Sequence, residues 1–510
     1  MRRSAVIGGG LSGLGAALIL RRLGREVVLV EKSSRLAPLV RGFRRDGLHY
    51  ETAFHYAGGL GKGQILYRYL DSLGLFEAGL KAKPLIGSGG EILRFSDGDV
   101  DIPGNYEAFR KFLPESKKID GFLGPLFSTF EKSLFLNPEV KTLDAGDSYL
   151  KGPSLAEALD ALDLDGHWRN ILGFRCLLYG VRPTEARFSE FALVNVPYLE
   201  GGGGFEGGGA ALAQAFENRA RSAGVTILGG REVTAIRTDS ANKVRALEFR
   251  DSGGRPEELE IDLCVYSGSP SALPGLLPEI ALRPVLARRL LSPRETPSAF
   301  MLFGHSGSAW LSGRQLFICP DGDLDDWFEP GRKLMYLSGG PGSLENDQPQ
   351  PDRDAGASLS SHRFFAQAES RPGRWPISVV SLLPKDATSA WAGFSPSSRP
   401  RSYLDFKERH AEELRRHILS SCPELNGDFE VAESATDLSF ESYSFNFGRG
   451  IYGTLHGRDE PPILPLTRVG GLALAGQNIV MPGLLGVLVS SALAVSCLVG
   501  LEPVLEVIHG

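Results

Sequence analysis

Cysteine is scarce in this sequence of 510 residues, and its placement excludes two classes of site. The five cysteines stand far apart, at Cys176, Cys264, Cys319, Cys422 and Cys497. None of them has the close spacing of a zinc site or of a redox-active pair. We therefore expect reduced, mostly buried thiols, no metal site, and a protein of a reducing compartment, the cytoplasm.

The chain also lacks an excess of positive charge. Its formal net charge is −6, and it contains no long basic run. Proteins that bind nucleic acids present a basic face, so we expect no nucleic-acid partner. With 42% hydrophobic and 23% charged residues, the composition is typical of a soluble globular protein.

Long hydrophobic runs are rare, and two stretches only imitate export or membrane signals. The apolar run that follows Arg2 and Arg3 is interrupted by five glycines and ends in two arginines, so we interpret it as belonging to the motif described next. Residues 483–501 are nearly uncharged. They follow a predicted strand and a polar turn and contain three serines, so we expect a buried helix there and not a membrane span.

What the sequence does contain is a dinucleotide-binding fingerprint at its start. A short apolar strand is followed by Gly8, Gly10 and Gly13, and Glu31 closes a second predicted strand. This spacing gives a tight turn, a close approach of backbone to a pyrophosphate, and close packing of helix on strand; the acid accepts hydrogen bonds from a ribose. The helix N-terminus then faces the phosphates. The expected cofactor contacts in this unit are Gly8, Gly10, Leu11, Ser12, Gly13, Glu31 and Lys32.

The order of predicted elements indicates an α/β protein with two lobes. One is a Rossmann-like cofactor lobe with three layers and a parallel sheet, and the other is a substrate lobe of mixed sheet plus helices. Alternation of strand and helix lapses in a Phe- and Leu-rich stretch that we expect to form a separate helical insertion. Three segments, 1–83, 201–283 and 436–510, are predicted to build the cofactor lobe, with the helical insertion at 84–200 and the substrate lobe at 284–435.

Within these segments, hydrophobic periodicity and turn residues predict individual elements. A hairpin is expected around Asp46-Gly47, and strand-like pieces at 92–95 and 100–102 precede the helical stretches of the insertion. Four strands are expected in the second cofactor segment, at 225–228, 232–238, 244–249 and 259–266, three of them in a meander. The substrate lobe should contain strands at 298–304, 316–319, 334–338 and 377–383, an exposed loop at 341–357, and an amphipathic helix at 403–421.

Four blocks in the same order resemble the family of FAD-dependent phytoene desaturases, carotenoid isomerases and retinol saturases. The first is the fingerprint with Glu31, where only Arg41 and Gly42 remain of the double glycine and arginine that family members carry. The others are the glycine-rich stretch 201–209 with 232–236, then 437–443 with 450–453, and lastly 476–478 with 482–486.

This resemblance implies a bound FAD and further residues that contact it. Val233 would offer its backbone to the adenine, and Arg41 would neutralise pyrophosphate charge. The helix that follows Pro482 would point its positive end at the isoalloxazine. The residues expected there are Gly476, Gln477, Gly486 and Val487.

The loop containing His55 and Tyr56 resembles that of the retinol saturase and carotenoid isomerase branch, and we expect these two residues to be catalytic groups near the flavin. The resemblance implies redox chemistry on a carbon–carbon double bond of a lipophilic polyene or lipid: desaturation, saturation or cis–trans isomerisation of a substrate like a carotenoid or retinoid. The sequence does not choose among the three. No second fingerprint of comparable quality is present, so a separate electron donor or acceptor is expected.

Two other functions stay open at this stage. A flavin amine oxidase would act on a smaller substrate and need an aromatic cage, for which Tyr443 and Tyr452 are the only nearby candidates. A non-catalytic FAD-binding lipid carrier is the other. For a lipophilic substrate, we also expect peripheral contact with a membrane through the Phe-rich stretch 105–136.

Overall fold

The N-terminal residues begin a parallel sheet, as the fingerprint predicts. In the computed structural model, strand β1 (Arg3–Ile7) leads through helix α1 (Leu11–Arg22) into strand β2 (Glu26–Val30), and β1 and β2 pair in parallel. Both strands are apolar and buried, which is typical of the centre of a parallel sheet. The structure describes residues 3–85, 90–133, 135–137, 152–329, 331–340, 373–444, 448–460 and 462–509.

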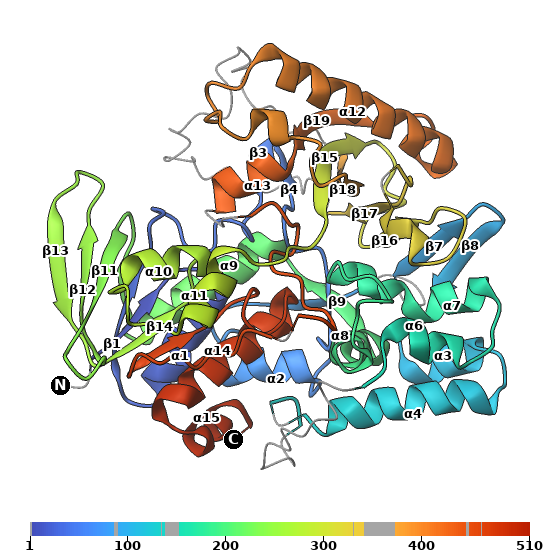
Figure 1. The fold of residues 1–510 in the computed structure, drawn as a ribbon. Coiled ribbons are helices and arrows are strands. Elements are labelled where there is room, and N and C mark those ends of the chain that lie inside the picture. The colour runs from blue at the N-terminus through green and yellow to red at the C-terminus, as the bar shows by residue number, and fades with distance from the viewer. Residues whose placement is uncertain are drawn as a thin grey trace.

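Three distant stretches of the chain complete this sheet. Its strand order is β10-β2-β1-β14-β20, all parallel, with β10 (Thr226–Leu228), β14 (Leu263–Tyr266) and β20 (Leu472–Leu474). One face packs on α1, α9 (Gly208–Ser222) and α14 (Gly483–Val499). The other face packs on an antiparallel sheet of β11 (Glu232–Thr238), β12 (Val244–Arg250) and β13 (Pro256–Glu260), seen at the left of Figure 1. The predicted three-layer cofactor lobe is thus confirmed.

One predicted strand proves to be two. The sequence favours a single strand over 259–266, but β13 ends at Glu260 and β14 starts at Leu263, in different sheets. The chain changes sheet at Asp262, whose backbone N–H donates to the Arg3 carbonyl and whose carboxylate pairs with Arg25. Alternating apolar residues continue through this corner, so periodicity alone does not reveal the break.

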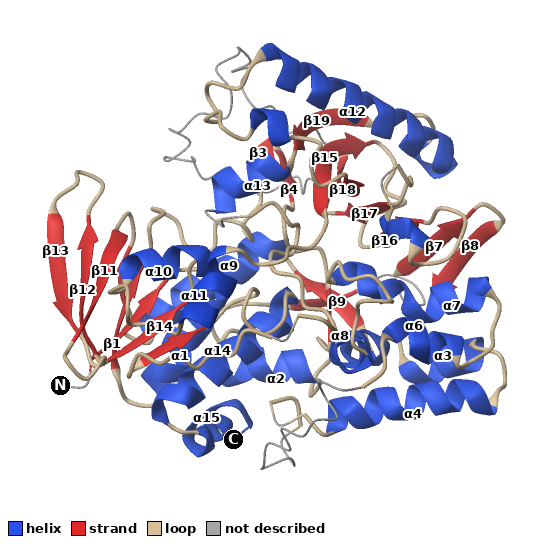
Figure 2. Cartoon of the chain, viewed as in Figure 1, coloured by secondary structure: helices blue, strands red, loops and turns tan. Residues whose placement is uncertain are grey.

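The second lobe is a seven-stranded mixed sheet with the order β19-β15-β18-β17-β16-β7-β8. Helix α12 (Arg401–Ser421) covers one face of it through Ala411, Leu414 and Ile418 (Figure 2). Its strands are β7 (Glu91–Phe95), β8 (Gly98–Ile102), β15 (Ser298–Ser306), β16 (Gln315–Ile318), β17 (Met335–Gly339), β18 (Trp375–Leu383) and β19 (Glu430–Ala435). The predicted loop 341–357 lies outside the described residues.

Two of these strands, β7 and β8, come from the segment 84–200. The sequence predicts strand-like pieces at 92–95 and 100–102, but it predicts that the segment forms a separate insertion. Strand β7 pairs in parallel with β16, so this segment extends the sheet of the substrate lobe. This pairing does not test where one domain ends and the next begins, so the domain boundaries that the sequence indicates stay a prediction. The helices of the segment are α3 (Tyr106–Phe112), α4 (Lys117–Glu131), α6 (Leu155–Asp160), α7 (Gly166–Gly173), the 3₁₀ helix η1 (Phe174–Leu178) and α8 (Phe188–Glu200).

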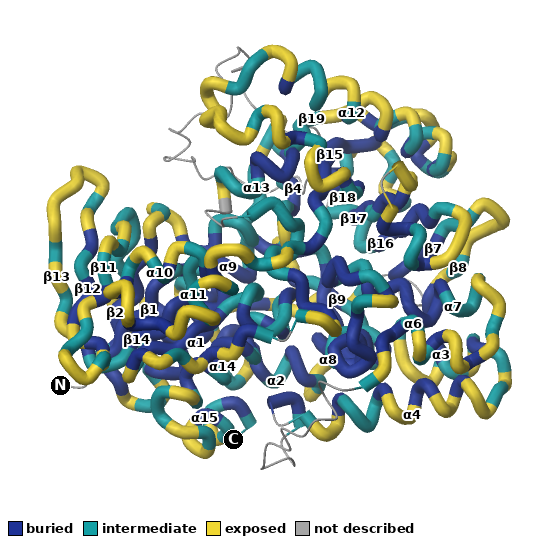
Figure 3. The backbone as a smooth tube through the Cα atoms, viewed as in Figure 1, coloured by how far each residue is buried: buried dark blue, intermediate teal, exposed yellow. Residues whose placement is uncertain are grey.

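The remaining elements are short. The strands are β3 (Phe43–Arg45), β4 (Leu48–Tyr50), β5 (Ala57–Gly58), β6 (Ala82–Pro84) and β9 (Gly202–Phe205). The helices are α2 (Ile65–Ser72), α10 (Leu273–Leu276), α11 (Pro284–Leu291), α13 (Asp437–Ser444) and α15 (Leu501–His509), with 3₁₀ helices at Pro270–Ala272, Asp326–Phe328, Ser389–Trp391 and Pro423–Leu425. Burial is continuous through the centre of the molecule, including α8 (Figure 3).

Among the residues that the structure describes, no helix has both the length and the apolar character needed to cross a bilayer. Helix α14 packs instead against α1 and α15, and its Leu488, Ala492 and Val495 are buried in the core. The expectation of a buried helix at this place is confirmed.

Candidate active site

A cavity of about 690 Å³ opens at the carboxyl edge of the parallel sheet and extends toward the substrate lobe. The turns after β1, β14 and β20 all contribute to its wall, at Gly8, Ser267 and Gly476. In open α/β sheets, ligands bind outside the carboxyl ends of the strands, so this is the place where the fold itself predicts a cofactor.

The fingerprint glycines have the geometry that a dinucleotide needs. Gly8 has φ +101°, and a Cβ there would contact the Ser267 backbone at 2.9 Å. A Cβ on Gly13 would clash with the carbonyl oxygen of Gly8, so close packing of helix on turn requires glycine. At Gly10 a Cβ would meet no atom within 4 Å, and this residue faces the cavity. The backbone therefore leaves open space where a pyrophosphate would approach.

Two helix N-termini are directed into this cavity without caps. Helix α1 follows Gly10 and helix α14 follows Pro482; neither has a side-chain cap or an acidic residue in its first turn. Their free N–H groups and positive dipole ends suit an anionic ligand. The donor set thus fits a dinucleotide with phosphates at one helix and an electron-rich ring at the other.

Glu31 is buried at the end of β2 and lines the cavity. Its Oε2 accepts from the Gly9 N–H at 2.5 Å and its Oε1 from the Ser33 N–H at 2.7 Å. A carboxylate has about four acceptor positions, so lone pairs remain for ribose hydroxyls. Its neighbour Lys32 also lines the cavity and ion-pairs with Glu232 at 2.7 Å.

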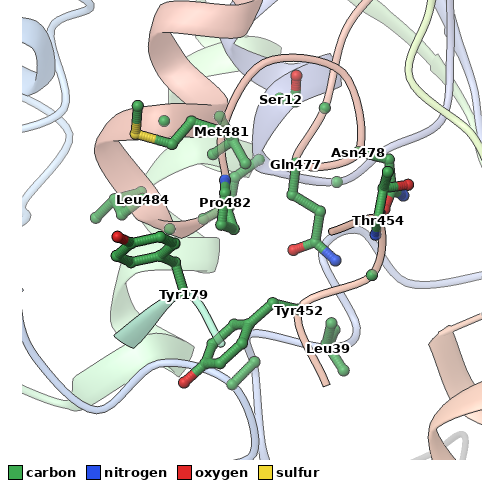
Figure 4. A pocket seen from close by; sticks show the side chains of 18 of the residues that line it. Ser12, Leu39, Tyr179, Tyr452, Thr454, Gln477, Asn478, Met481, Pro482 and Leu484 are labelled. Atoms are coloured by element: carbon green, nitrogen blue, oxygen red, sulfur yellow. The ribbon is translucent and has the colours of Figure 1, made fainter. Parts of the chain in front are cut away.

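The loop around Tyr452 and His456 is hydrogen-bonded to the turn that follows β20. The Thr454 N–H donates to Asn478 Oδ1 at 2.8 Å, and His456 Nε2 donates to the Gln477 carbonyl at 2.9 Å. Burial lowers the pKa of His456 to about 4, with the Gln477 contact acting in the opposite direction, so the imidazole is neutral at pH 7. These bonds hold Tyr452 and Gln477 on one wall of the cavity (Figure 4).

At the substrate-lobe end, apolar side chains surround a small polar group. Tyr56 donates to Glu91 Oε1 at 2.6 Å, and the buried Glu91 pairs with the buried Arg175 at 2.6 Å. The ring of His55 lies edge-on to Tyr336, with centroids 5.3 Å apart. The apolar portion of this wall includes Leu177, Leu193, Phe317, Phe328, Leu334 and Leu382.

The titration of His55 is shifted by its surroundings. This residue lines the cavity, and desolvation lowers the pKa of the imidazole to about 4. Burial, together with the charge of Glu91, raises the pKa of Tyr56 well above 10. Both groups are therefore neutral at pH 7, and an imidazolium is not available there as a proton donor.

The sequence of this protein matches a known family. The pattern described as "Flavin containing amine oxidoreductase" covers residues 11–309, more than half of the chain. This chain belongs to that family. It is an FAD-dependent oxidoreductase, and the expected cofactor and α/β fold are confirmed.

Several relatives that align with almost the whole of this flavin-dependent oxidoreductase are named all-trans-retinol 13,14-reductase. The human protein is 26% identical over 97% of this chain and 85% of its own length, and the Danio rerio protein is 21% identical over 95% and 84%. They confirm the resemblance to the retinol saturase branch that the four sequence blocks indicate. A solved oxidoreductase from Methanosarcina mazei superposes with a TM-score of 0.62 at 16% identity, covering 96% of this chain and 98% of that one. Putrescine oxidase reaches 0.59 at 14% identity, covering 100% and 99%. These two likenesses show the fold alone.

The cavity of this flavin-dependent oxidoreductase collects most of the residues proposed from its sequence. The proposed residues that line it are Gly8, Gly10, Leu11, Ser12, Glu31, Lys32, His55, Tyr56, Val233, Gly476, Gln477, Gly486 and Val487. Gly13 lies behind the wall, where it packs against Gly8. The roles of these residues at the cofactor stay predictions.

Arg41 does not line the cavity. Its guanidinium pairs with Glu217 on α9 at 2.6 Å and donates to the Leu36 carbonyl at 2.8 Å. Desolvation lowers the pKa of Arg41, while Glu217 acts to raise it. The structure therefore places this arginine in a link between the first loop and α9. Its role at a pyrophosphate stays a prediction.

Sequence reasoning also misses several aromatic and charged residues of the site. Tyr443, a cage candidate from its sequence position, is 42% exposed and does not line the cavity, whereas Tyr179 lies beside Tyr452 (Figure 4). No sequence motif singles out Glu91 or Arg175 either. Because these two partners are 84 positions apart, no local spacing can pair them.

Proposed function

We propose that this protein saturates one carbon–carbon double bond of a long polyene alcohol of the retinoid type. The observation that carries the proposal is the alignment of almost the whole chain with proteins named all-trans-retinol 13,14-reductase. An apolar wall at the substrate-lobe end of the cavity supports it, because a polyene needs such a wall. Desaturation and cis–trans isomerisation would use the same cavity and are distinguished by the test below.

FAD, once bound and reduced, would supply a hydride to one carbon of the double bond, and a proton that comes from solvent would complete the other carbon. The chain contributes binding, orientation and exclusion of water. The turn at Gly8–Gly10 and the start of α1 would hold the pyrophosphate, Glu31 the ribose, and the start of α14 the pyrimidine side of the ring system. Val233 would contact the adenine. Leu177, Phe317 and their apolar neighbours would hold the polyene, with His55 and Tyr56 as polar groups close to the reacting end.

A separate electron donor belongs to this proposal. The sequence contains no second dinucleotide fingerprint of comparable quality, so reduction between turnovers would depend on another protein or a diffusible donor. The free cysteines, four of them buried, are consistent with the reducing compartment that we propose, the cytoplasm.

The test is a product analysis. FAD-loaded protein is reduced anaerobically and incubated with all-trans-retinol. The products are extracted and their molecular masses are measured by mass spectrometry. A product two mass units heavier, with absorption at shorter wavelength, supports saturation. A product of equal mass and altered retention indicates isomerisation. Because desaturation needs an oxidised flavin, a parallel incubation uses the oxidised protein, and a product two units lighter there indicates desaturation. Unchanged retinol contradicts the proposal.

Oxidation of an amine is the second candidate, and a specific observation favours it. Tyr452 packs on Gly180, next to Tyr179, so two neighbouring phenols line the cavity (Figure 4). Such a pair could enclose an amine beside the ring system. Hydrogen peroxide formation with diamines or aromatic amines in air would support this second candidate.

We further propose that the protein contacts a membrane surface, but not through 105–136. Among the described residues of that stretch, the large apolar side chains of α4 are mostly buried. The most exposed ones lie elsewhere: Ile280 is 85%, Val285 68%, Leu464 66% and Leu466 63% exposed. The two segments are neighbours, because Asn242 Nδ2 donates to the carbonyls of Ala281 and Arg468. We call these four residues the apolar patch; the exposed Arg283, Arg288 and Arg468 flank it in sequence.

A further inference from the structure

We propose that Tyr56 is a specificity-determining residue that accepts a hydrogen bond from a hydroxyl group of the substrate. Glu91 and Arg175 are the positioning residues that fix the direction of this bond. The inference rests on the proposed function, since it concerns which polyene end the cavity prefers.

The three residues form a buried chain behind the cavity wall. The Tyr56 hydroxyl donates to Glu91 Oε1 at 2.6 Å, and Arg175 Nη2 donates to Glu91 Oε2 at 2.6 Å. Arg175 Nη1 continues the chain to Asn195 Oδ1 at 2.8 Å. The side chains of Arg175 and Glu91 are only 2% and 4% exposed, so water does not compete for these bonds.

Only one arrangement of protons satisfies this chain. A guanidinium can only donate, and the carboxylate that it pairs with can only accept. The proton between Tyr56 and Glu91 is therefore the phenol's own, and it points into the wall. Tyr56 also lines the cavity. We infer that the phenol oxygen, whose proton is committed to Glu91, offers a lone pair to a ligand there.

A second phenol beside it has the same polarity. Tyr336 donates its proton to Gln315 Oε1, and its ring centroid lies 6.5 Å from that of Tyr56. Tyr336 also lines the cavity. Ser338 also bonds to the Tyr336 hydroxyl, so a remaining lone pair of this phenol would suit a ligand group that donates.

This polarity discriminates among the ends that a polyene can carry. An alcohol donates a hydrogen bond to Tyr56. An ether or an aldehyde has no proton to give, and a carboxylate would set its lone pairs against those of the phenol, close to the charge of Glu91.

The test compares two probes on oxidised, FAD-loaded protein. Equilibrium dialysis in the dark measures the Kd for all-trans-retinol and for its methyl ether, which lacks only the donated proton and carries one more methyl group. Tyr56→Phe should weaken retinol binding about threefold to tenfold and leave ether binding within twofold. The ether-to-alcohol Kd ratio of the wild type should thus fall in the variant.

Tyr69→Phe is the matched control. Tyr69 is a buried phenol outside the cavity wall that donates to the Phe135 carbonyl at 2.8 Å. The same chemical change there should leave the ether-to-alcohol ratio unchanged. A ratio that shifts equally in both variants would mean a general loss of packing and would overturn the inference.

The outcomes separate the inference from the proposed function. A wild type that binds both probes equally well, or a Tyr56→Phe protein with the wild-type ratio, overturns the inference alone. A wild type that binds neither probe contradicts the proposed function, and the inference falls with it. If Tyr56→Phe loses its flavin, Glu91→Gln decides: an amide donates to Tyr56 and frees the phenol proton, so the affinity for the ether should rise relative to retinol. An unchanged ratio in that variant overturns the inference.

Discussion

An added Cβ at Gly10 would meet no atom of the protein, whereas one at Gly13 would strike the Gly8 carbonyl. The motif requires glycine at these two positions for different reasons, one for a ligand and the other for packing. Substitution at Gly10 therefore tests the cofactor site with little effect on the fold.

Gly10→Val should give folded protein that has lost its FAD. The branched side chain would occupy the open space at the start of α1 where the pyrophosphate is expected. The ratio of flavin absorbance to protein measures the loss, with circular dichroism as a check of folding. Gly124→Val, on α4 and equally free of neighbours, is the matched control and should keep its flavin. A flavin-replete Gly10→Val protein would contradict the placement of the pyrophosphate.

His55→Gln should keep FAD and fold while turnover of retinol falls about 10²- to 10⁴-fold, because a neutral imidazole can relay a proton between its two ring nitrogens and an amide cannot. Because the pKa of His55 is about 4, the neutral imidazole is the form present in the wild type, and its titration should leave the rate flat between pH 6 and 8. Rates at pH 6, 7 and 8 check this point. His410→Gln on α12 is the control. Wild-type turnover in His55→Gln would make this residue structural.

At the scale of elements, the regions that sequence predicts best are those with local signals. The β1-α1-β2 unit, the hairpin of β3 and β4 around Asp46-Gly47, and the apolar strands β15 to β18 follow from periodicity and turn residues. Which strands share a sheet does not follow from such signals. Strand β7 joins β16 over more than 200 residues, and only tertiary packing selects that partner.

The residues of the site also differ in whether a local signal in the sequence identifies them. Gly8, Gly10, Glu31 and Gly476 belong to spaced motifs, and the sequence alone identifies them. Family analogy predicts that Arg41 neutralises pyrophosphate charge, and the sequence does not reveal its ion pair with Glu217 on α9. Tyr179, Glu91 and Arg175 belong to no motif, because each acquires its place from a long-range contact.

The loop that carries Tyr452 gives a prediction about pH. Since the pKa of buried His456 is about 4 in the folded protein and about 6.5 when exposed, the unfolded chain binds more protons between these values. This histidine therefore lowers folding stability as pH falls from about 6.5 to about 4. His456→Gln, whose amide can still donate to the Gln477 carbonyl, should remove roughly 1–2 kcal/mol of the stability difference between pH 7 and pH 5.

Urea unfolding of both proteins at pH 5 and pH 7 measures that difference. Flavin content should be close to that of the wild type, because the bond to Gln477 is retained. An equal pH dependence in the two proteins would show that His456 is protonated in the folded state as readily as in the unfolded one.

At the scale of the whole molecule, both lobes contribute to the wall of the cavity, and the apolar patch lies on the surface outside it. Double substitution of Ile280→Asp with Leu464→Asp should reduce binding to vesicles of phosphatidylcholine and phosphatidylserine at least threefold, since it places charge where apolar surface would enter the headgroup region. Flotation with the vesicles measures the bound fraction. Phe394→Asp, at an exposed apolar residue elsewhere, is the control. Undiminished flotation of the double variant would contradict the proposed contact.

The central claim is that electrons pass from the bound flavin to a polyene double bond in this cavity, and anaerobic stopped-flow spectroscopy tests it most directly. The FAD-loaded protein is reduced with one equivalent of dithionite and mixed with all-trans-retinol, and flavin absorbance near 450 nm, roughly the usual band of oxidised FAD, is followed. The account predicts that the flavin is reoxidised and that dihydroretinol forms in equal amount. Flavin that stays reduced in the presence of saturating retinol, in a protein that reacts readily with oxygen afterwards, would contradict it.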